Sequence, residues 1–256
     1  MPHPSLRPRL QAGETLYTAW ATMPDPLVAE FVARSGFDAV TLDMQHGNLS
    51  TESAMRGIAA ITLAGKPAIV RVPIGRFEMA SRALDFGACA VIAPMVNTVA
   101  DAKAFAAAMK FPPLGERSWG PTRVLALHGI ASPQAYLETA NHDTLAIAMI
   151  ETRAAYSALD DILAVDGIDG VFVGPSDLSI ALSGGAKVDA NNADMLELAG
   201  EIATKAARAG KIPCTLASGA ETGRRSRELG FRLIALGNDV MYLSHGANAM
   251  VDGARG

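Results

Sequence analysis

The stretches TLAIAMIE (residues 144–151) and DGVFVG (169–174) decide the predicted fold. Each is an almost unbroken apolar run, and one helix-length segment separates them. A strand exposed on one face alternates apolar and polar residues, whereas an unbroken apolar run indicates a strand buried on both faces of a parallel sheet. The two runs therefore predict one strand–helix–strand unit with parallel strands.

The same pattern recurs along the chain and predicts six further strands. They are residues 15–21, 38–43, 67–72, 89–94, 212–217 and 232–237. Eight strand–helix units in 256 residues predict a (β/α)8 barrel, formed by residues 1–256 as a single domain. The alternative is a doubly wound open sheet, which should have a glycine-rich phosphate-binding turn after its first strand. Here that strand runs into WATMPDP (20–26), which disfavours the alternative.

Composition and charge exclude several classes of function. Half of the residues are hydrophobic, and the net charge of −4 comes with 22 scattered Lys and Arg residues, so no nucleic-acid partner is expected. No apolar stretch reaches about 18 residues and the N-terminus lacks a signal core, so no membrane partner is expected. Two cysteines without a CxxC pair fit a reducing cytoplasm. The proline-broken segment 1–13 is predicted to be a loose arm.

Ionisable side chains stand where several predicted strands end. Asp43 and His46 follow the second strand, Arg71 ends the third, Glu151 ends the fifth, and Asp177 follows the sixth. The other strand ends carry Trp20, Pro94, Leu216, and Asn238 with Asp239. In a barrel, all carboxyl ends of the strands meet at one mouth, where active sites are found. Taken alone, Asp43 and His46 read as a turn with a self-satisfied histidine, but four converging strand ends favour an active site.

Glu151 and Asp177 follow neighbouring strands and are predicted to lie side by side. Two carboxylates in a dry mouth repel each other unless a cation lies between them. Mg²⁺ or Mn²⁺ would suit, since one or two protein carboxylates commonly hold such ions. In the alternative interpretation Asp177 caps the next helix and Glu151 pairs with Arg153. The residues alone leave both interpretations open.

Arg71 lies in the otherwise apolar run AIVRVP (68–73), where an unpaired guanidinium would be costly. It either pairs with Glu151 or Asp43 or binds an anionic substrate. No lysine ends a predicted strand, which disfavours Schiff-base chemistry, and neither a nucleophile elbow nor HExxH is present. The remaining groups suit stabilisation of an enolate: a metal, an arginine, and a histidine that moves the proton.

Residues 111–143 interrupt the repeat between the fourth and fifth strands. We expect this insertion to lie over the mouth and to set specificity. There Arg117, Arg123 and His128 could receive an acidic group of the substrate, although exposed lid residues are the simpler interpretation.

Several stretches resemble the class II 2-oxo-acid aldolases of the HpcH/HpaI family. They are FDAVTLDMQHG, VRVP, ALDFGACAVIAPMVNTVADA, FPPLGERSWG, IETRAA, GIDGVFVGPSDLS and LIALGNDVMYL, in family order over most of the chain. The resemblance implies a phosphoenolpyruvate/pyruvate-type barrel whose last helix packs on a neighbouring subunit, commonly in a hexamer built as a trimer of dimers. It implies reversible cleavage of a 4-hydroxy-2-oxo acid to pyruvate and an aldehyde, with Mg²⁺, Mn²⁺ or Co²⁺ and no organic cofactor.

The resemblance also implies a role for each site residue. Glu151 and Asp177 would bind the metal, Arg71 would stabilise the enolate oxygen, and His46, oriented by Asp43, would exchange the proton. Substrate contacts would come from Trp20, Leu216 and the backbone around Ser176, and Asp85 would reach across the subunit interface. Three residues depart from the family pattern: Gln45 for glutamate, Met149 for glutamine, and Ser118 for glycine.

Two other functions use the same barrel. A phosphoenolpyruvate-mutase-like enzyme or a lyase of citrate or malyl-CoA thioesters should have extra phosphate or nucleotide contacts, and no basic cluster suggests them. A non-catalytic 2-oxo-acid binding protein would not need the ionisable residues at the mouth.

Overall fold

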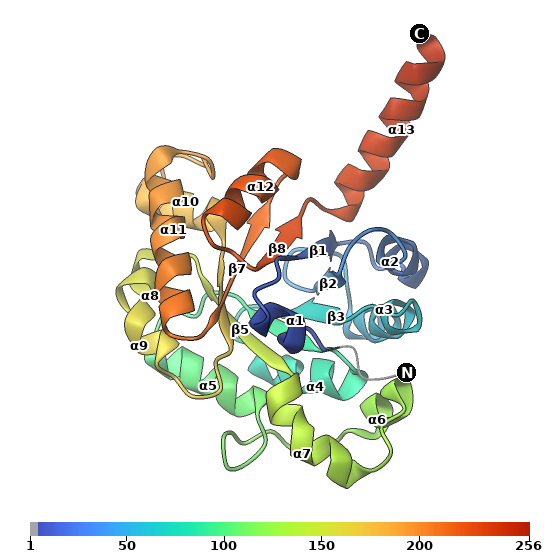
Figure 1. The fold of residues 1–256 in the computed structure, drawn as a ribbon, viewed down its shortest axis with the longest axis vertical. Coiled ribbons are helices and arrows are strands. Elements are labelled where there is room, and N and C mark those ends of the chain that lie inside the picture. Colours follow the sequence, from blue (N-terminus) through green and yellow to red (C-terminus); the bar gives the residue numbers. More distant parts are fainter. Residues whose placement is uncertain (1–4) are drawn as a thin grey trace.

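The computed structural model describes residues 5–256, which form a closed parallel barrel (Figure 1). Its strands are β1 (Leu16–Ala21), β2 (Ala39–Asp43), β3 (Ala68–Arg71), β4 (Ala90–Ala93), β5 (Leu145–Ile150), β6 (Gly170–Val173), β7 (Ile212–Ala217) and β8 (Leu233–Leu236). Each strand pairs with the next in sequence, and β8 closes the barrel on β1. The predicted (β/α)8 barrel is confirmed, and the open sheet is excluded.

Helices surround the barrel and connect successive strands (Figure 1). They are α1 (Arg7–Gln11), α2 (Pro26–Ala33), α3 (Thr51–Leu63), α4 (Phe77–Phe86), α5 (Val99–Met109), α6 (Thr122–His128), α7 (Pro133–Asp143), α8 (Arg153–Ser157), α9 (Leu159–Leu163), α10 (Pro175–Leu182), α11 (Ala193–Arg208), α12 (Ala220–Glu228) and α13 (Asp239–Arg255). Within residues 5–256, no helix combines the length and apolar character needed to cross a bilayer.

The core has two layers because strand residues alternate in direction. Side chains such as Ile69, Ile147 and Phe172 fill the barrel interior. Their neighbours, such as Val70 and Val171, pack outward against the helices. Both sets are buried, which is why the strands read as unbroken apolar runs rather than alternating ones.

The N-terminal end of the barrel is closed by α1. Leu6 and Leu10 are buried in the cluster that fills the barrel interior. Arg7 donates to Asp169 at the start of β6, with 2.5 Å between Nη2 and Oδ1. The predicted loose arm over residues 1–13 is therefore wrong for α1, since two leucines and an ion pair fix this helix. Residues 1–4 lie outside the described part of the chain.

The insertion between β4 and β5 lies at this same end, not over the mouth as expected. Lys110, fully buried after α5, donates to Thr144 O (2.7 Å) just before β5 and to Asp169 Oδ2 (2.7 Å). The ring of His128 contacts the carbonyl oxygen of Gly87, which ends α4. The expectation of a lid was wrong because α5 runs from the mouth back to the N-terminal end, and β5 must begin there.

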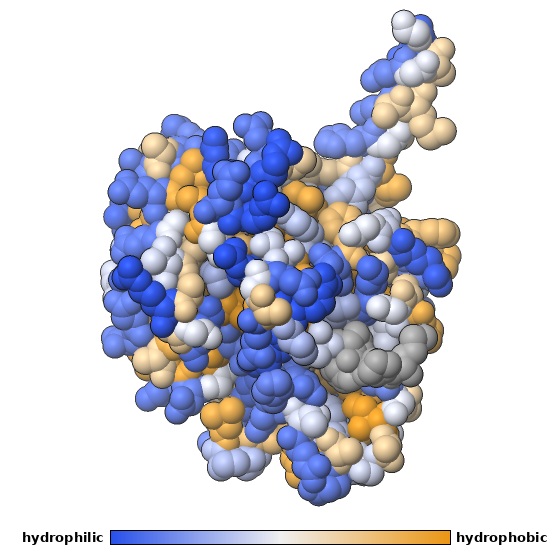
Figure 2. All heavy atoms as spheres, in the orientation of Figure 1, coloured by the Kyte–Doolittle hydropathy of each residue, from blue (hydrophilic) through white to orange (hydrophobic). Residues whose placement is uncertain are grey.

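The last helix, α13, projects away from the barrel (Figure 1). Four of its apolar side chains are exposed: Val240, Leu243, Met250 and Val251. Figure 2 shows hydrophobic residues along the projecting helix. These residues recur at helical spacing and form an apolar stripe, which we call the α13 stripe.

Candidate active site

Asp43 and Arg71 form a buried, bidentate ion pair at the mouth of the barrel. They end β2 and β3 and are partners in the strand register. Arg71 donates from Nε to Asp43 Oδ1 (2.8 Å) and from Nη2 to Oδ2 (2.7 Å). Trp20, at the end of β1, donates from Nε1 to Asp43 Oδ2 (3.2 Å), and its ring centroid lies 4.8 Å from the guanidinium carbon. Three adjacent strands thus hold one guanidinium in a fixed orientation.

The carboxyl group of Asp43 stays ionised although it is buried. Burial alone raises its pKa, but the hydrogen bonds and charge of Arg71 and the backbone N–H groups of Gln45 and His46 hold the pKa below the ordinary value. The pairing of Arg71 with Asp43, which the residues alone left open, is therefore present. Burial raises the pKa of Glu151, and the positive charge of Arg71 acts against this shift.

Glu151 is a buried carboxylate held by backbone groups. Its Oε1 accepts from the N–H of Met95 (2.8 Å), a non-glycine residue whose φ of 55° lies in the left-handed region. Its Oε2 lies so close to Gly174 that an added Cβ there would be 2.5 Å away, so a larger residue at this position would require the Glu151 carboxylate to shift. Burial raises the pKa of Glu151, the Met95 N–H lowers it, and the charge of Asp177 raises it again.

Asp177 lies in the first turn of α10. Burial is the main cause of the raised pKa of Glu151, and the charge of Asp177 raises it further. The side chain of Asp177 does not cap α10, since Gly174 occupies the N-cap without a side-chain hydrogen bond. Arg153 donates to the carbonyl oxygens of Ala181 and Leu182 rather than to Glu151. Across residues 5–256, neither carboxylate forms an ion pair with a basic side chain. Neither the predicted cap by Asp177 nor the predicted pair of Glu151 with Arg153 is therefore present among the described residues.

The chemistry of these donors fits a hard divalent cation. Two adjacent carboxylates offer oxygen ligands, and the repulsion between them is relieved when a cation binds. The described residues contain no cluster of three or more His, Cys, Asp or Glu side chains that would enclose an ion. Glu151 and Asp177 would therefore leave coordination positions for water and substrate, as is usual for Mg²⁺.

His46 lies exposed on the loop after β2. Asp43 accepts from its backbone N–H (3.3 Å), not from its ring, among the contacts of the described chain. The expected orientation of the imidazole by Asp43 is therefore not observed. The physical reason is the strand register, which sets Arg71 opposite Asp43. Arg71 then donates hydrogen bonds to both carboxylate oxygens of Asp43.

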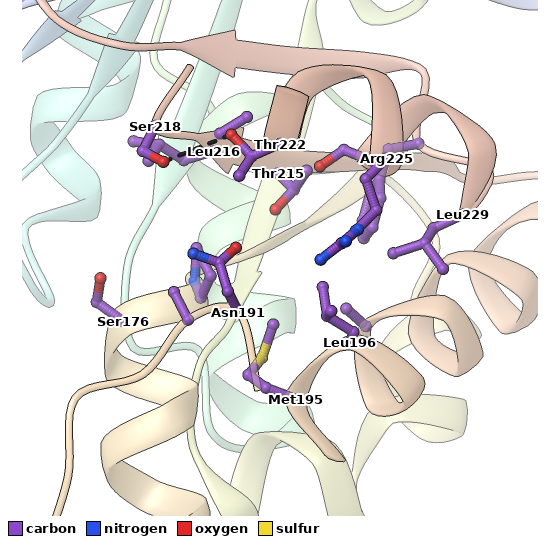
Figure 3. Close-up of a pocket in the computed structure, with 16 residues that line it drawn as sticks. Ser176, Asn191, Met195, Leu196, Thr215, Leu216, Ser218, Thr222, Arg225 and Leu229 are labelled. Carbon is purple, nitrogen blue, oxygen red and sulfur yellow. Dashed lines mark hydrogen bonds between the residues drawn. The ribbon is translucent and has the colours of Figure 1, made fainter. Parts of the chain in front are cut away.

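Ser176 and Leu216 border a cavity of about 100 Å³ outside β7 (Figure 3). Figure 3 shows that Asn191 from the loop before α11 and Arg225 from α12 point into it. None of the mouth residues described above lines this cavity. The substrate contacts predicted for Ser176 and Leu216 stay predictions.

Asp85 lies at the end of α4 that faces away from the mouth of its own barrel. Arg117, fully buried, donates from Nη2 to Asp85 Oδ1 (2.6 Å) and packs on the ring of Phe111. Burial raises the pKa of Asp85 even though Arg117 opposes the shift. Within one chain, the structure therefore does not bring Asp85 to the other site residues.

Sequence reasoning missed two groups that shape the site. The backbone N–H of Met95 donates to Glu151, and Met95 has a left-handed backbone conformation that the sequence does not predict. Gly174 is visible as a glycine after β6, but the sequence does not show that Glu151 packs against it.

Comparisons with known proteins cover the whole barrel. The model of the HpcH/HpaI aldolase/citrate lyase family matches residues 16–246. The hydroxypyruvate/pyruvate aldolase of Rhizorhabdus wittichii is 35% identical over 243 residues, which is 95% of this chain and 95% of that protein. The 4-hydroxy-2-oxo-heptane-1,7-dioate aldolase of Salmonella arizonae is 33% identical and covers 94% and 90%, respectively. A solved HpcH/HpaI aldolase/citrate lyase family protein from Burkholderia cenocepacia J2315 superposes with a TM-score of 0.88 at 28% identity, over 98% of this chain and 99% of that chain.

Proposed function

Because the chain belongs to the HpcH/HpaI aldolase/citrate lyase family, we propose that it is a class II aldolase. It reversibly cleaves a 4-hydroxy-2-oxo acid to pyruvate and an aldehyde. One observation carries this proposal: within the described part of the chain neither Glu151 nor Asp177 pairs with a basic side chain, and the charges of Asp177 and Arg71 both act on Glu151. Two relatives are named hydroxypyruvate/pyruvate aldolases, so we include hydroxypyruvate beside pyruvate as a candidate 2-oxo-acid product of this protein.

Glu151 and Asp177 would hold the divalent metal, for which Mg²⁺, Mn²⁺ and Co²⁺ are the candidates. When bound, the metal polarises the 2-oxo group and so favours loss of a neighbouring proton or carbon–carbon bond. The backbone around Ser176, next to Asp177 in the first turn of α10, would bind the substrate carboxylate.

In the cleavage direction, the 4-hydroxyl group loses its proton and the C3–C4 bond breaks. The electron pair of that bond moves toward C2, and negative charge develops on the C2 oxygen. Arg71 stabilises this charge, since Asp43 and Trp20 hold its guanidinium in place before substrate arrives. His46, exposed at the mouth, takes the hydroxyl proton, and protonation of C3 then yields the methyl group of pyruvate.

The apolar side chains of Trp20, Met149 and Phe172 lie in the interior cluster below the mouth. They keep water away from the developing enolate and strengthen the interaction with Arg71. Met149 offers no hydrogen bond to the substrate, and we infer that orientation depends on the carboxylates and Arg71 instead.

The decisive experiment is an assay of pyruvate release from 4-hydroxy-2-oxo acids, with and without a chelator. We expect chelation to abolish the activity and Mg²⁺, Mn²⁺ or Co²⁺ to restore it. A full rate in the chelator would contradict the metal-dependent mechanism. Exchange of the pyruvate methyl protons into heavy water separates an enzyme from a 2-oxo-acid binding protein, which would bind pyruvate without exchange.

We also propose that the protein assembles through α13 into a homo-oligomer, as a hexamer built from dimers. The exposed α13 stripe on a helix that leaves its own barrel supports this proposal. Asp85 would then lie close to a neighbouring subunit.

Introducing a charge into the α13 stripe should disrupt the assembly. We expect Met250→Glu to lower the mass measured by light scattering after size-exclusion chromatography, because a buried carboxylate without a partner is costly. His245→Glu, on the opposite face of the helix, is the matched control and should keep the mass of the parent. Equal masses for parent and Met250→Glu would argue against assembly through this stripe.

A further inference from the structure

The seam between β8 and β1 is bridged by a side chain at its mouth end. In this parallel pair, the N–H of Leu16 donates to Arg232 O (2.7 Å), and such bonds recur at every second residue. Two steps further along, this spacing would join the N–H of Trp20 to Leu236 O, but the ladder ends at the pair Thr18 and Ala235. The hydroxyl of Tyr242 stands between these groups instead. It donates to Leu236 O and accepts from the N–H of Trp20 (3.4 Å).

A second residue of α13 fixes the chain that follows β1. Asp239 is buried and accepts from the backbone N–H groups of Thr22 and Met23, at 2.8 Å each. Its other oxygen accepts from the hydroxyl of Thr22 (2.7 Å) and the N–H of Val240 (3.0 Å). Since charge-assisted bonds to backbone donors are strong, the first turn of α13 and the end of β1 form one unit.

This unit connects directly to the mouth through Trp20. Its backbone N–H is held by Tyr242, and its indole N–H donates to Asp43 Oδ2 (3.2 Å). Asp43 in turn forms the two bonds to Arg71. Burial raises the pKa of Tyr242 to about 12, so its hydroxyl keeps the proton it donates at neutral pH. A continuous series of hydrogen bonds therefore joins α13 to the guanidinium.

We propose that Tyr242 and Asp239 are positioning residues, which fix Trp20 and through it the orientation of the Asp43–Arg71 pair. The proposal rests on the proposed function only for the role of Arg71 in the reaction. Among the described contacts, neither Tyr242 nor Asp239 bonds to Glu151 or Asp177. Each therefore acts through the seam between β8 and β1.

The first test removes the bridging hydroxyl in Tyr242→Phe. We expect kcat to fall about tenfold with little change in KM, because a misplaced guanidinium loses charge stabilisation in the transition state. Tyr156→Phe is the matched control, since its hydroxyl bonds only Glu201 on the outer helices among the described residues. In a Trp119→Phe background Trp20 is the sole tryptophan, and its emission should change in Tyr242→Phe but not in the control.

Asp239→Asn is the second variant and should show the same drop in kcat and the same change in emission. The proposal is overturned if both variants only lower Tm while kcat stays at the parent value. It is also overturned if the emission of Trp20 changes without any loss of kcat. A parent protein without aldolase activity would contradict the proposed function alone, and the emission of Trp20 would still decide whether the seam fixes this residue.

Discussion

Arg71→Ala is expected to lower kcat for aldol cleavage about 100- to 1,000-fold, which corresponds to about 2.7–4 kcal/mol of transition-state stabilisation. The guanidinium lies near Glu151 and is held in advance by Asp43 and Trp20, so its loss removes a preorganised positive charge. Steady-state kinetics of pyruvate release measures the effect. Arg56→Ala is the control, because Arg56 is exposed on α3 and pairs with Glu52 of the same helix.

The same variant should change how stability depends on pH. In the parent, the lowered pKa of Asp43 means that its contribution is present above the unfolded pKa and is lost as pH falls through the folded pKa. Without Arg71, burial raises the pKa of Asp43 instead, and the ionised form destabilises the fold. We therefore expect the difference in Tm between parent and variant to be larger at pH 7 than below about pH 4, near the ordinary pKa of aspartate. A pH-independent difference in Tm, with kcat unchanged, would contradict both roles of Arg71.

Glu151→Gln is expected to remove the metal-dependent activity, with a loss of at least about 100-fold in kcat/KM. Glutamine keeps the shape of the side chain and an oxygen that accepts from the N–H of Met95, so the local fold should persist. The negative charge that would hold the cation together with Asp177 is gone. Calorimetric titration with Mn²⁺ should show binding to the parent and much weaker binding to the variant.

Glu138→Gln provides the matched control, since Glu138 lies exposed on α7 and bonds only Gln134 within the described chain. Asp177→Asn should resemble Glu151→Gln in both measurements. Parent-like Mn²⁺ affinity in both carboxamide variants would show that the metal binds elsewhere.

The strands were predictable because a parallel barrel buries both faces of each strand. TLAIAMIE and DGVFVG are unbroken apolar runs, and they form β5 and β6 with Glu151 directly after the first. Because parallel strands share one direction, the sequence also predicted that Glu151 and Asp177 would lie together. Their proximity depends only on strand order and strand ends, which the residues reveal.

Other features depend on three-dimensional contacts that the residues do not reveal. Asp43 pairs with Arg71 because the register of β2 and β3 sets them opposite each other, and sequence reasoning could not choose between this partner and Glu151. The prolines in residues 1–13 suggested a loose arm, yet Leu6 and Leu10 are buried in the cluster that fills the barrel interior. The prediction that residues 111–143 lie over the mouth was wrong. The position of this insertion follows from the direction of α5, which the composition of the insertion does not reveal.

The buried Lys110–Asp169 network and the Arg71–Asp43 pair occupy opposite poles of the same barrel. The Lys110–Asp169 network ties residues before β5 and β6 together, whereas the Arg71–Asp43 pair belongs to the proposed active site, and the packed barrel interior separates the two. We therefore expect substitutions at Lys110 or Asp169 to lower the melting temperature more than they lower turnover.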